Sequence, residues 1–404
     1  MMQLESITKT RPVDVVLYAE GTYPFRVGGV SSVIHGIISS LPGIQFGVIH
    51  LHWGDRPGRS CFKNLPNHVW TFPLRVADFP SAGRKLREIK FPRAAVHHAH
   101  TCGLAGLAAA TARRQQPGSR MILSEHSLYA RDVLAQLDRG HQGWSPMPGS
   151  NEMPPVPPGD SCDLRATILE AARHMYDHAD VVTYLHRGLL EDAVAFGLDP
   201  AKATILPNAI DIEAFRMTRK PRNRATTWHI AIIGRIVPVK GILEGIDCAD
   251  MLRKAGLDFR MSIIGPDDEV PCYAEACRQK VLDLGLQDII QFKVTAPATE
   301  ALRDVDLLLL PSQQEAMPMV VLESMAAGVP VIATDTGNVA RLLGDRDEYQ
   351  AGFVIKVDCM ASAIMKLLAD TGRYHAMREN GPHRAARNFD ARARARHWLE
   401  LYSI

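Results

Sequence analysis

Short apolar runs alternate with amphipathic stretches along the chain. Such runs are typical of strands buried in a parallel sheet, and the stretches between them have the period of helices. In the first half the predicted strands are residues 13–19, 45–51, 94–100, 120–124, 181–184 and 204–207. Residues 30–40 and 104–114 are predicted helices. Strands that alternate with helices indicate a parallel, doubly wound sheet.

The second half repeats this alternation. Its predicted strands are residues 229–234, 260–265, 289–293, 307–310 and 331–333, and its helices are about 242–254, 272–284 and 319–327. The predicted fold class is therefore α/β, with two facing Rossmann-like domains and a parallel sheet in each. Because ligands bind at the carboxyl ends of such strands, we expect a deep cleft between the domains.

The length of 404 residues also suggests two domains. We place the first at 1–210 and the second at 211–385, divided by the polar, basic stretch 211–227. Residues 386–404 form a basic amphipathic pattern, predicted as a C-terminal helix that crosses back to the first domain. The Pro-rich stretch 138–160 is either a surface insertion or a loop over the acceptor side.

Composition narrows the class of protein. A formal net charge of +2 gives no case for nucleic acid as a partner. The chain has no run of 18 apolar residues and no secretory pattern at its start. The seven cysteines form no C-x-x-C pair, and their odd number argues against a disulfide framework. We expect a cytoplasmic protein with reduced thiols.

The stretch 311–335, PSQQEAMPMVVLESMAAGVPVIATD, carries the most chemical information. Glu315 follows a predicted buried strand, and Glu323 lies eight positions later inside a predicted helix. Free amides at a helix start favour phosphate oxygens, and carboxylates accept hydrogen bonds from sugar hydroxyls. Two glutamates at this spacing are more often a solvated helix face, but the strand and the apolar helix around them favour a ligand site.

This segment resembles the E-x(7)-E signature of retaining GT-B glycosyltransferases of family 4. The resemblance implies that Glu323 holds the ribose hydroxyls of a nucleotide sugar and that Glu315 touches the donor sugar. It also implies that the backbone amides of Met319 and Val320 contact phosphate, and that Val294 contacts the nucleobase through its backbone.

Arg235 and Lys240 lie in GRIVPVKG, directly after a predicted strand. Most Arg and Lys side chains are surface charges, but a Gly-Arg turn at a strand end followed by Lys suits a diphosphate. The segment resembles the G-R-x-x-x-x-K-G motif of the same family, which implies that both cations neutralise the leaving diphosphate. Such neutralisation makes a metal unnecessary, so we predict no metal site and no cofactor.

His126 ends the fourth predicted strand. A lone histidine is more often structural, but the resemblance places it beside the reacting face of the donor sugar. Glu125 is a candidate either to orient His126 or to face the acceptor. In the HHAH run, His97, His98 and His100 do not converge on one ion, because alternate residues of a strand point to opposite faces. His100 stays a candidate for lining the cleft.

Gly28 and Gly29 follow the first predicted strand, where glycines let a ligand approach the backbone. They are either a simple turn or a phosphate or acceptor contact. The strings EGTYPFRVGGVSS and SEHSLYARD resemble the Pel-polysaccharide glycosyltransferases within family 4. That resemblance implies a UDP-sugar donor, polysaccharide synthesis, and peripheral association with a membrane biosynthetic complex at the inner face of the membrane.

The predicted function is that of a retaining hexosyltransferase. It moves a sugar from a nucleotide sugar, expected to be UDP-linked, to a hydroxyl of a glycan or small-molecule acceptor. A non-catalytic nucleotide-sugar-binding subunit and a nucleotide-sugar epimerase or phosphorylase are the alternatives. An NAD-dependent oxidoreductase is disfavoured, because G-x-G-x-x-G does not follow the first predicted strand.

Overall fold

The computed structural model describes residues 11–52, 58–76, 79–138, 161–216, 227–294, 297–344 and 349–403. The chain divides into two compact units. The N-terminal unit comprises Met1–Asn208 together with Ala391–Ile404, and the C-terminal unit is Ala209–Asp390. Residues 139–160 of the Pro-rich stretch and 217–226 of the predicted linker lie outside the described residues.

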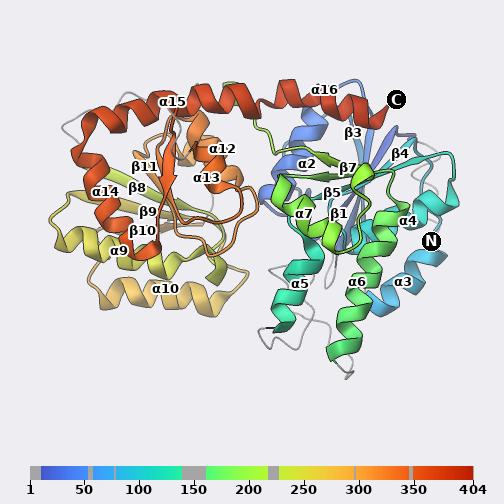
Figure 1. Ribbon diagram of the computed structural model, residues 1–404, viewed down its shortest axis with the longest axis horizontal. Coiled ribbons are helices and arrows are strands. Elements are labelled where there is room, and N and C mark those ends of the chain that lie inside the picture. The colour runs from blue at the N-terminus through green and yellow to red at the C-terminus, as the bar shows by residue number, and fades with distance from the viewer. Residues whose placement is uncertain are drawn as a thin grey trace. The chain divides into compact units, whose positions relative to one another are not determined.

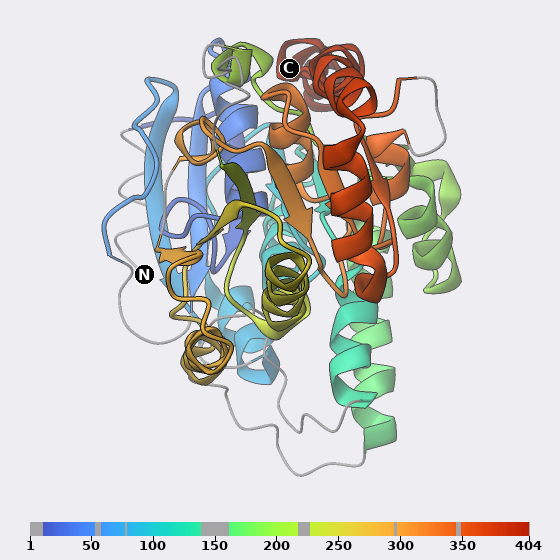
Figure 2. The same cartoon turned by 90° about the vertical axis from the view of Figure 1, so that its left-hand side faces the viewer.

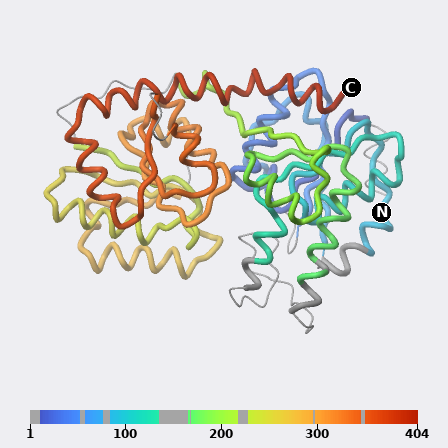
Figure 3. Tube along the Cα trace, in the orientation of Figure 1, coloured from blue at the N-terminus to red at the C-terminus, as the bar shows by residue number. Residues whose placement is uncertain are grey.

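The N-terminal unit is built on a parallel seven-stranded sheet in the order β3-β2-β1-β4-β5-β6-β7 (Figures 1 and 3). Its strands are β1 (Val15–Glu20), β2 (Phe46–His52), β3 (His68–Arg75), β4 (Val96–Ala99), β5 (Arg120–Glu125), β6 (Val181–Tyr184) and β7 (Ala203–Ile205). The inner strands β1 and β2 are buried along their full length, which explains why their sequences are mostly apolar.

Helices cover both faces of this sheet. They are α2 (Gly29–Ser40), α3 (Phe79–Glu88), α4 (Leu104–Gln115), α5 (Tyr129–Asp138), α6 (Ser161–His178), α7 (Arg187–Ala195), the short 3-10 turn η1 (Pro200–Lys202) and α16 (Ala391–Tyr402). On one face, α2 and α16 pack together over Val15, Leu17 and Phe46. On the other, α4 packs against α3 and α6.

The C-terminal unit has a parallel six-stranded sheet in the order β10-β9-β8-β11-β12-β13. Its strands are β8 (Trp228–Ile233), β9 (Phe259–Ile264), β10 (Ile290–Lys293), β11 (Leu307–Leu310), β12 (Val331–Ala333) and β13 (Gly352–Val354). With the helices of this unit they form a second Rossmann-like layer structure, so the predicted fold class of two parallel-sheet domains is confirmed.

The helices of the C-terminal unit also form two layers. They are α8 (Ile212–Arg216), η2 (Pro238–Lys240), α9 (Ile242–Lys254), α10 (Pro271–Asp283), α11 (Ala298–Ala301), α12 (Met319–Ala326), α13 (Val339–Leu343), η3 (Val357–Cys359), α14 (Met360–Ala369) and α15 (Thr371–Phe389). Helices α9, α10 and α14 share one apolar core, and Figure 2 shows α9 and α10 side by side. Helix α12 packs against α13 and α15.

The C-terminal stretch differs from its prediction. The predicted division after residue 385 falls inside α15, and the expected single helix over 386–404 is in fact the end of α15 followed by α16. The two helices separate at Asp390. This residue is extended (φ −70°, ψ 124°) and forms an isolated parallel β-bridge with Ile210. Helix α16 belongs to the N-terminal unit, and the units divide at residues 208 and 390. Within the described residues, no helix is both long and apolar enough to cross a membrane.

Candidate active site

The predicted donor-site residues of the C-terminal unit gather at the carboxyl edge of its sheet. Arg235 follows β8, and Lys240 ends the 3-10 turn η2 just before α9. Glu315 lies in the loop between β11 and α12, and Glu323 lies within α12. Because parallel strands end at a common edge, four separate segments bring two cations and two carboxylates to one side of the sheet.

Lys240 and Glu315 form a mostly buried ion pair. Nζ of Lys240 lies 2.6 Å from Oε1 of Glu315, and the side chains are 20% and 8% exposed. The pair is fixed by backbone contacts, because the Gln313 amide donates to the Val239 carbonyl at 2.8 Å. Gly241 has a left-handed conformation (φ 64°), and a Cβ there would lie 2.1 Å from the Pro311 carbonyl oxygen. Only glycine therefore allows this close approach of the two loops.

Arg235 has a carboxylate partner that the sequence analysis missed. Its Nη1 lies 2.5 Å from Oε1 and 2.6 Å from Oε2 of Glu269, which is in the loop after β9. The signal in the sequence was the acidic run Asp267-Asp268-Glu269 at the end of a predicted strand. The run alone does not show which of its three carboxylates meets Arg235, so the pairing could not be deduced from it.

Helix α12 presents a free N-terminus next to these pairs. It begins after Pro318, and no side chain caps it and no acidic residue lies in its first turn. Met319 and Val320 are half-buried, so the helix dipole and the free amides favour an anion here. Glu323 lies four residues after Met319, on the same face.

Glu323 has a raised pKa for a carboxylate. It is half-buried, and burial raises its pKa to about 7. No described side chain forms an ion pair with it. A carboxylate that accepts hydrogen bonds from ligand hydroxyls would recover the solvation that Glu323 lacks here.

Val294 follows β10 at the edge of the same sheet. Its side chain is 65% exposed, which is unusual for valine. The backbone at the end of β10 is tied to the end of β9, because the Gly265 amide donates to the Lys293 carbonyl at 2.9 Å. The predicted backbone contact of Val294 with a nucleobase stays a prediction.

The N-terminal unit holds His126, just after β5. Its Nε2 lies 3.0 Å from Nδ1 of His100, and the two rings stack with centroids 5.3 Å apart. Burial lowers the pKa of His126 to about 4 and that of His100 well below its usual value. Both rings are therefore neutral at pH 7. The orienting partner of His126 is His100 rather than Glu125.

The HHAH run divides as the strand period requires. His98 and His100 share one face, with ring centroids 4.2 Å apart, whereas His97 bonds the Tyr18 hydroxyl at 2.9 Å. His98 bonds Tyr402 and Ser124. His100 is 3% exposed. These contacts give the run a structural role.

Glu20 and Glu125 are buried acids at the carboxyl ends of β1 and β5, strands that flank β4. Burial raises the pKa of each to about 8. Glu20 accepts a hydrogen bond from the Ala105 amide at 3.1 Å, at the start of α4. Glu125 accepts one from the Tyr176 hydroxyl at 3.2 Å. Both hydrogen bonds are made within the N-terminal unit, which favours a structural role for these two glutamates.

Gly28 precedes α2 as its N-cap, and Gly29 begins the helix. A Cβ at Gly28 would meet no atom within 4 Å, and its backbone is extended (φ 177°). The fold itself therefore does not require glycine at this position. No described side chain caps α2, so its first amides are open to an anion, and a contact of Gly28 and Gly29 with a phosphate or acceptor stays a prediction.

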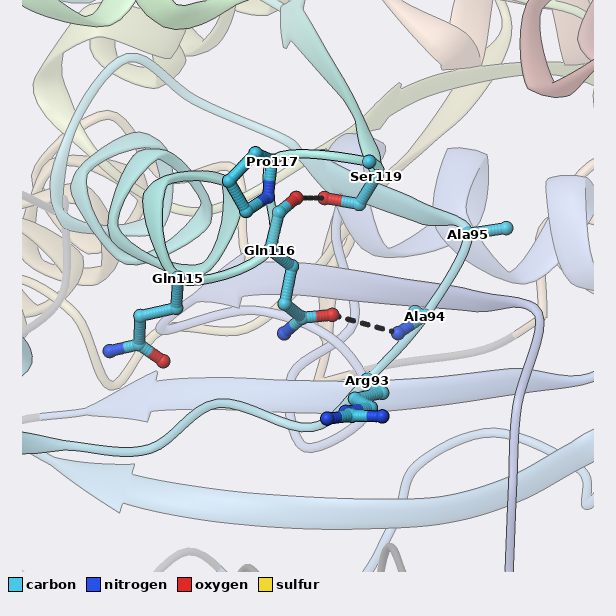
Figure 4. A pocket seen from close by; sticks show the side chains of 8 residues that line it. Arg93, Ala94, Ala95, Gln115, Gln116, Pro117 and Ser119 are labelled. Carbon is cyan, nitrogen blue, oxygen red and sulfur yellow. Dashed lines mark hydrogen bonds between the residues drawn. The ribbon is translucent and has the colours of Figure 1, made fainter.

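A shallow pocket of the N-terminal unit lies at the opposite edge of its sheet, near the starts of β4 and β5. Figure 4 shows Gln116 lying against the backbone beside β4. Its side chain accepts from the Ala94 amide at 3.2 Å and donates to the Pro92 carbonyl at 2.8 Å. The polar groups of Gln116 already bind the backbone, so this pocket is no competitor for the candidate site.

Two family models match adjacent parts of the chain. One, described as Glycosyltransferase Family 4, matches residues 27–214, and the other, described as Glycosyl transferases group 1, matches residues 215–384. Together with the two parallel-sheet units, these matches show that the chain belongs to the glycosyltransferases of the GT-B type.

Individual proteins and solved structures are also similar to this chain. The crystal structure of Anabaena Alr3699/HepE in complex with UDP and glucose is 16% identical, with a TM-score of 0.72 over 97% of this chain and 99% of that one. A GDP-mannose-dependent alpha-(1-6)-phosphatidylinositol monomannoside mannosyltransferase of Mycolicibacterium smegmatis is 28% identical over 68% of this chain and 70% of its own length. A D-inositol 3-phosphate glycosyltransferase of Paenarthrobacter aurescens is 30% identical, over 37% of this chain and only 39% of the relative.

Proposed function

We propose that the protein is a retaining hexosyltransferase that uses a nucleotide sugar, UDP-linked, and an acceptor hydroxyl. The observation that carries this proposal is the carboxyl edge of the C-terminal sheet. There, Arg235, Lys240 and the free N-terminus of α12 supply positive charge for a diphosphate. Glu323 and Glu315 supply acceptors for ribose and sugar hydroxyls.

The transfer needs no nucleophile from the protein. The bond from the anomeric carbon to the diphosphate oxygen breaks, and a bond to the acceptor oxygen forms on the same face of the sugar. The acceptor proton goes to the departing phosphate oxygen. Arg235 and Lys240 stabilise the negative charge that develops on the diphosphate, so that the reaction requires no metal ion. The resemblance of the sequence to family 4 assigns His126 to the reacting face of the sugar.

The acceptor is a growing glycan in this proposal, as the Pel-like N-terminal segments suggest, and the enzyme works on the cytoplasmic face of a membrane biosynthetic complex. The inositol-linked substrates in the names of two relatives favour a second candidate, a small polyol acceptor. The GDP-mannose in one of these names makes GDP the competing nucleotide.

The first test is a calorimetric titration of metal-free protein with UDP, GDP and ADP. We expect UDP to bind without added metal, and Glu323→Ala and Lys240→Ala each to weaken that binding. Asp268→Ala is the control, because Asp268 is exposed in the same unit. Binding of GDP alone would replace the nucleotide in the proposal, and binding of no nucleoside diphosphate would refute it.

A second measurement tests turnover and stereochemistry. Wild-type protein is incubated with UDP-hexoses and with glycan or polyol acceptors, and the anomeric configuration of the first product is read by NMR. Retention of the donor configuration supports the proposal, and inversion contradicts it. Tight UDP binding without hydrolysis or transfer would indicate a non-catalytic subunit instead.

A further inference from the structure

The guanidinium of Arg235 is clamped at one end by a buried carboxylate. Only Nη1 contacts Glu269, at 2.5 Å and 2.6 Å from its two oxygens. The Glu269 side chain is 6% exposed, whereas that of Arg235 is 31% exposed. Nε and Nη2 of Arg235 bond no other described residue, so their N–H groups stay available to a ligand.

The loops that carry this pair are locked together by backbone contacts. Gly265 has φ 157°, and a Cβ there would lie 1.9 Å from the Gly234 carbonyl oxygen. The Ile236 amide donates to the Pro266 carbonyl at 2.9 Å. The loops after β8 and β9 therefore run in contact, which fixes the distance between the backbones of Arg235 and Glu269.

The loop of Glu269 is anchored from its other side as well. Asp267 bonds Arg278 of α10, and the Arg278 guanidinium lies 5.6 Å from the centre of the Phe292 ring on β10. The loop is thus held on one side by the loop after β8 and on the other by Arg278 of α10, which packs on Phe292 of β10. A carboxylate on a loop anchored twice is a fixed point from which a flexible arginine can be oriented.

We infer that Glu269 is a positioning residue, which orients Arg235 so that its free N–H groups receive the phosphate oxygens of the donor. This inference rests on the proposed function, since it gives Arg235 the diphosphate as its ligand. An unheld arginine loses rotamer freedom when it binds, and a clamped one has lost it already. Glu269 itself does not touch the donor.

A competing role for Glu269 would have the opposite effect. A carboxylate that only neutralises Arg235 in the unliganded protein must be displaced by the diphosphate, so removing it would tighten binding. A purely structural role would lower stability and weaken binding whether or not Arg235 is present. The three roles therefore differ in whether removing Glu269 weakens or tightens ligand binding, and in whether that change requires Arg235.

The experiment is a double-mutant cycle on the full chain, with Glu269→Ala, Arg235→Ala and the double variant. Calorimetry measures their affinities for UDP and for inorganic pyrophosphate without metal, and thermal unfolding checks that each variant is folded. Asp268→Ala is the matched control, because it removes an exposed carboxylate one residue away. Glu269→Gln keeps the size of the side chain and removes its charge.

We expect Glu269→Ala to weaken UDP binding about tenfold in the presence of Arg235, and less than about twofold in its absence. Glu269→Gln should fall between wild type and Glu269→Ala, and Asp268→Ala should match wild type. An equal loss in both backgrounds, or tighter binding by Glu269→Ala, overturns the inference and leaves the proposed function standing. Coupled binding of pyrophosphate with no binding of UDP, GDP or ADP overturns the function and keeps the inference. Binding of no ligand overturns both.

Discussion

Burial raises the pKa of Glu323 to about 7, so its charge changes near neutral pH. The cause is desolvation by burial. Among the described residues no cation pairs with Glu323, whereas Lys240 lies against Glu315. The two glutamates of one motif thus differ in electrostatic environment. Glu315 is paired with Lys240, whereas no side chain in the described ranges donates a hydrogen bond to the Glu323 carboxylate.

The first prediction concerns the pH dependence of binding. A raised pKa means that Glu323 is charged above pH 7 and neutral below it, and a charged carboxylate accepts stronger hydrogen bonds from ribose hydroxyls. UDP affinity should therefore fall about fivefold between pH 8 and pH 6. Calorimetry at both pH values measures the change. In Glu323→Gln the part of this fall in affinity that comes from Glu323 should vanish, because only the titration of UDP itself remains. Stronger binding of UDP by wild type at pH 6 than at pH 8 would contradict the prediction.

The second prediction concerns the buried pair of Lys240 and Glu315. Lys240→Met leaves the Glu315 carboxylate buried without its cation, which should lower the free energy of unfolding by about 2 kcal/mol. The double variant Lys240→Met/Glu315→Gln removes both charges and should recover most of that loss. Urea unfolding measures all three proteins. A double variant as unstable as Lys240→Met would show that the charge of Glu315 is not the cause.

At the scale of residues, local sequence motifs predict some of the candidate site residues but not the contacts between them. Arg235, Lys240, Glu315 and Glu323 were predicted because each follows a strand end or lies in a helix with a recognisable neighbourhood. The pairing of Lys240 with Glu315 and of Arg235 with Glu269 was not predictable in the same way. The pairing of Arg235 with Glu269 spans 34 residues, because it depends on which strands are adjacent in the sheet.

At the scale of elements, buried strands were the easiest to predict. Residues 181–184, 307–310 and 331–333 were predicted with the bounds that the structure has. Strand β3 was missed because it contains Pro73 and is mostly half-buried, so it has no continuous apolar run. It lies at the edge of its sheet, where a proline is tolerated.

Helix α16 shows how an amphipathic pattern becomes a specific contact. Trp398 and Tyr402 are 7% and 2% exposed and pack in the core with α2 and β1. The Tyr402 hydroxyl lies 2.9 Å from Nδ1 of His98, on β4. The sequence could predict the apolar face of this helix, but not the buried histidine that its tyrosine bonds.

The third prediction concerns this contact. Tyr402→Phe leaves Nδ1 of His98 buried without its partner and should lower the free energy of unfolding by about 1–2 kcal/mol. Trp398→Ala should cost more, about 3 kcal/mol, because it removes a large buried ring. Leu399→Ala is the control, since Leu399 is 49% exposed in the same helix. Urea unfolding measures the free energy of unfolding of each variant. A Tyr402→Phe protein as stable as Leu399→Ala would mean that the hydroxyl contributes nothing to stability.

At the scale of the whole molecule, alternation of strands and helices was enough to predict two doubly wound parallel sheets. The exact ends of the units were harder, because the C-terminal stretch continues the helical pattern through residue 385 and breaks only at Asp390. The burial of these titratable side chains was not predictable at all. It arises where the strands of the N-terminal unit place His98, His100, Glu20 and Glu125 in an interior formed by several elements.

These buried groups make stability depend on pH in two opposite ways. Burial lowers the pKa of His50, His97 and His126 to about 4 and that of His98 to about 3. The stability of a protein with neutral buried histidines is lost as pH falls from 6.5 towards 4, because the unfolded chain binds the protons. The raised pKa of about 8 of each buried glutamate acts in the other direction, since the folded state then holds more protons than the unfolded chain.

The fourth prediction is therefore a maximum of stability near pH 6.5. Above that value the histidine contribution is complete and no longer changes with pH, whereas the contribution of protonated Glu20 and Glu125 is lost as pH rises towards 8. The free energy of unfolding should fall by about 2 kcal/mol per pH unit between pH 6.5 and 8, about 1 kcal/mol from each of the two glutamates. Urea unfolding at half-unit steps from pH 4.5 to 8.5 measures the curve. Glu125→Gln should flatten its upper limb, and the exposed control Glu88→Gln should leave it unchanged. If the curve is flat above pH 6.5 in wild type, the two glutamates ionise without loss of stability, and the interior around α4 is far better solvated than its burial indicates.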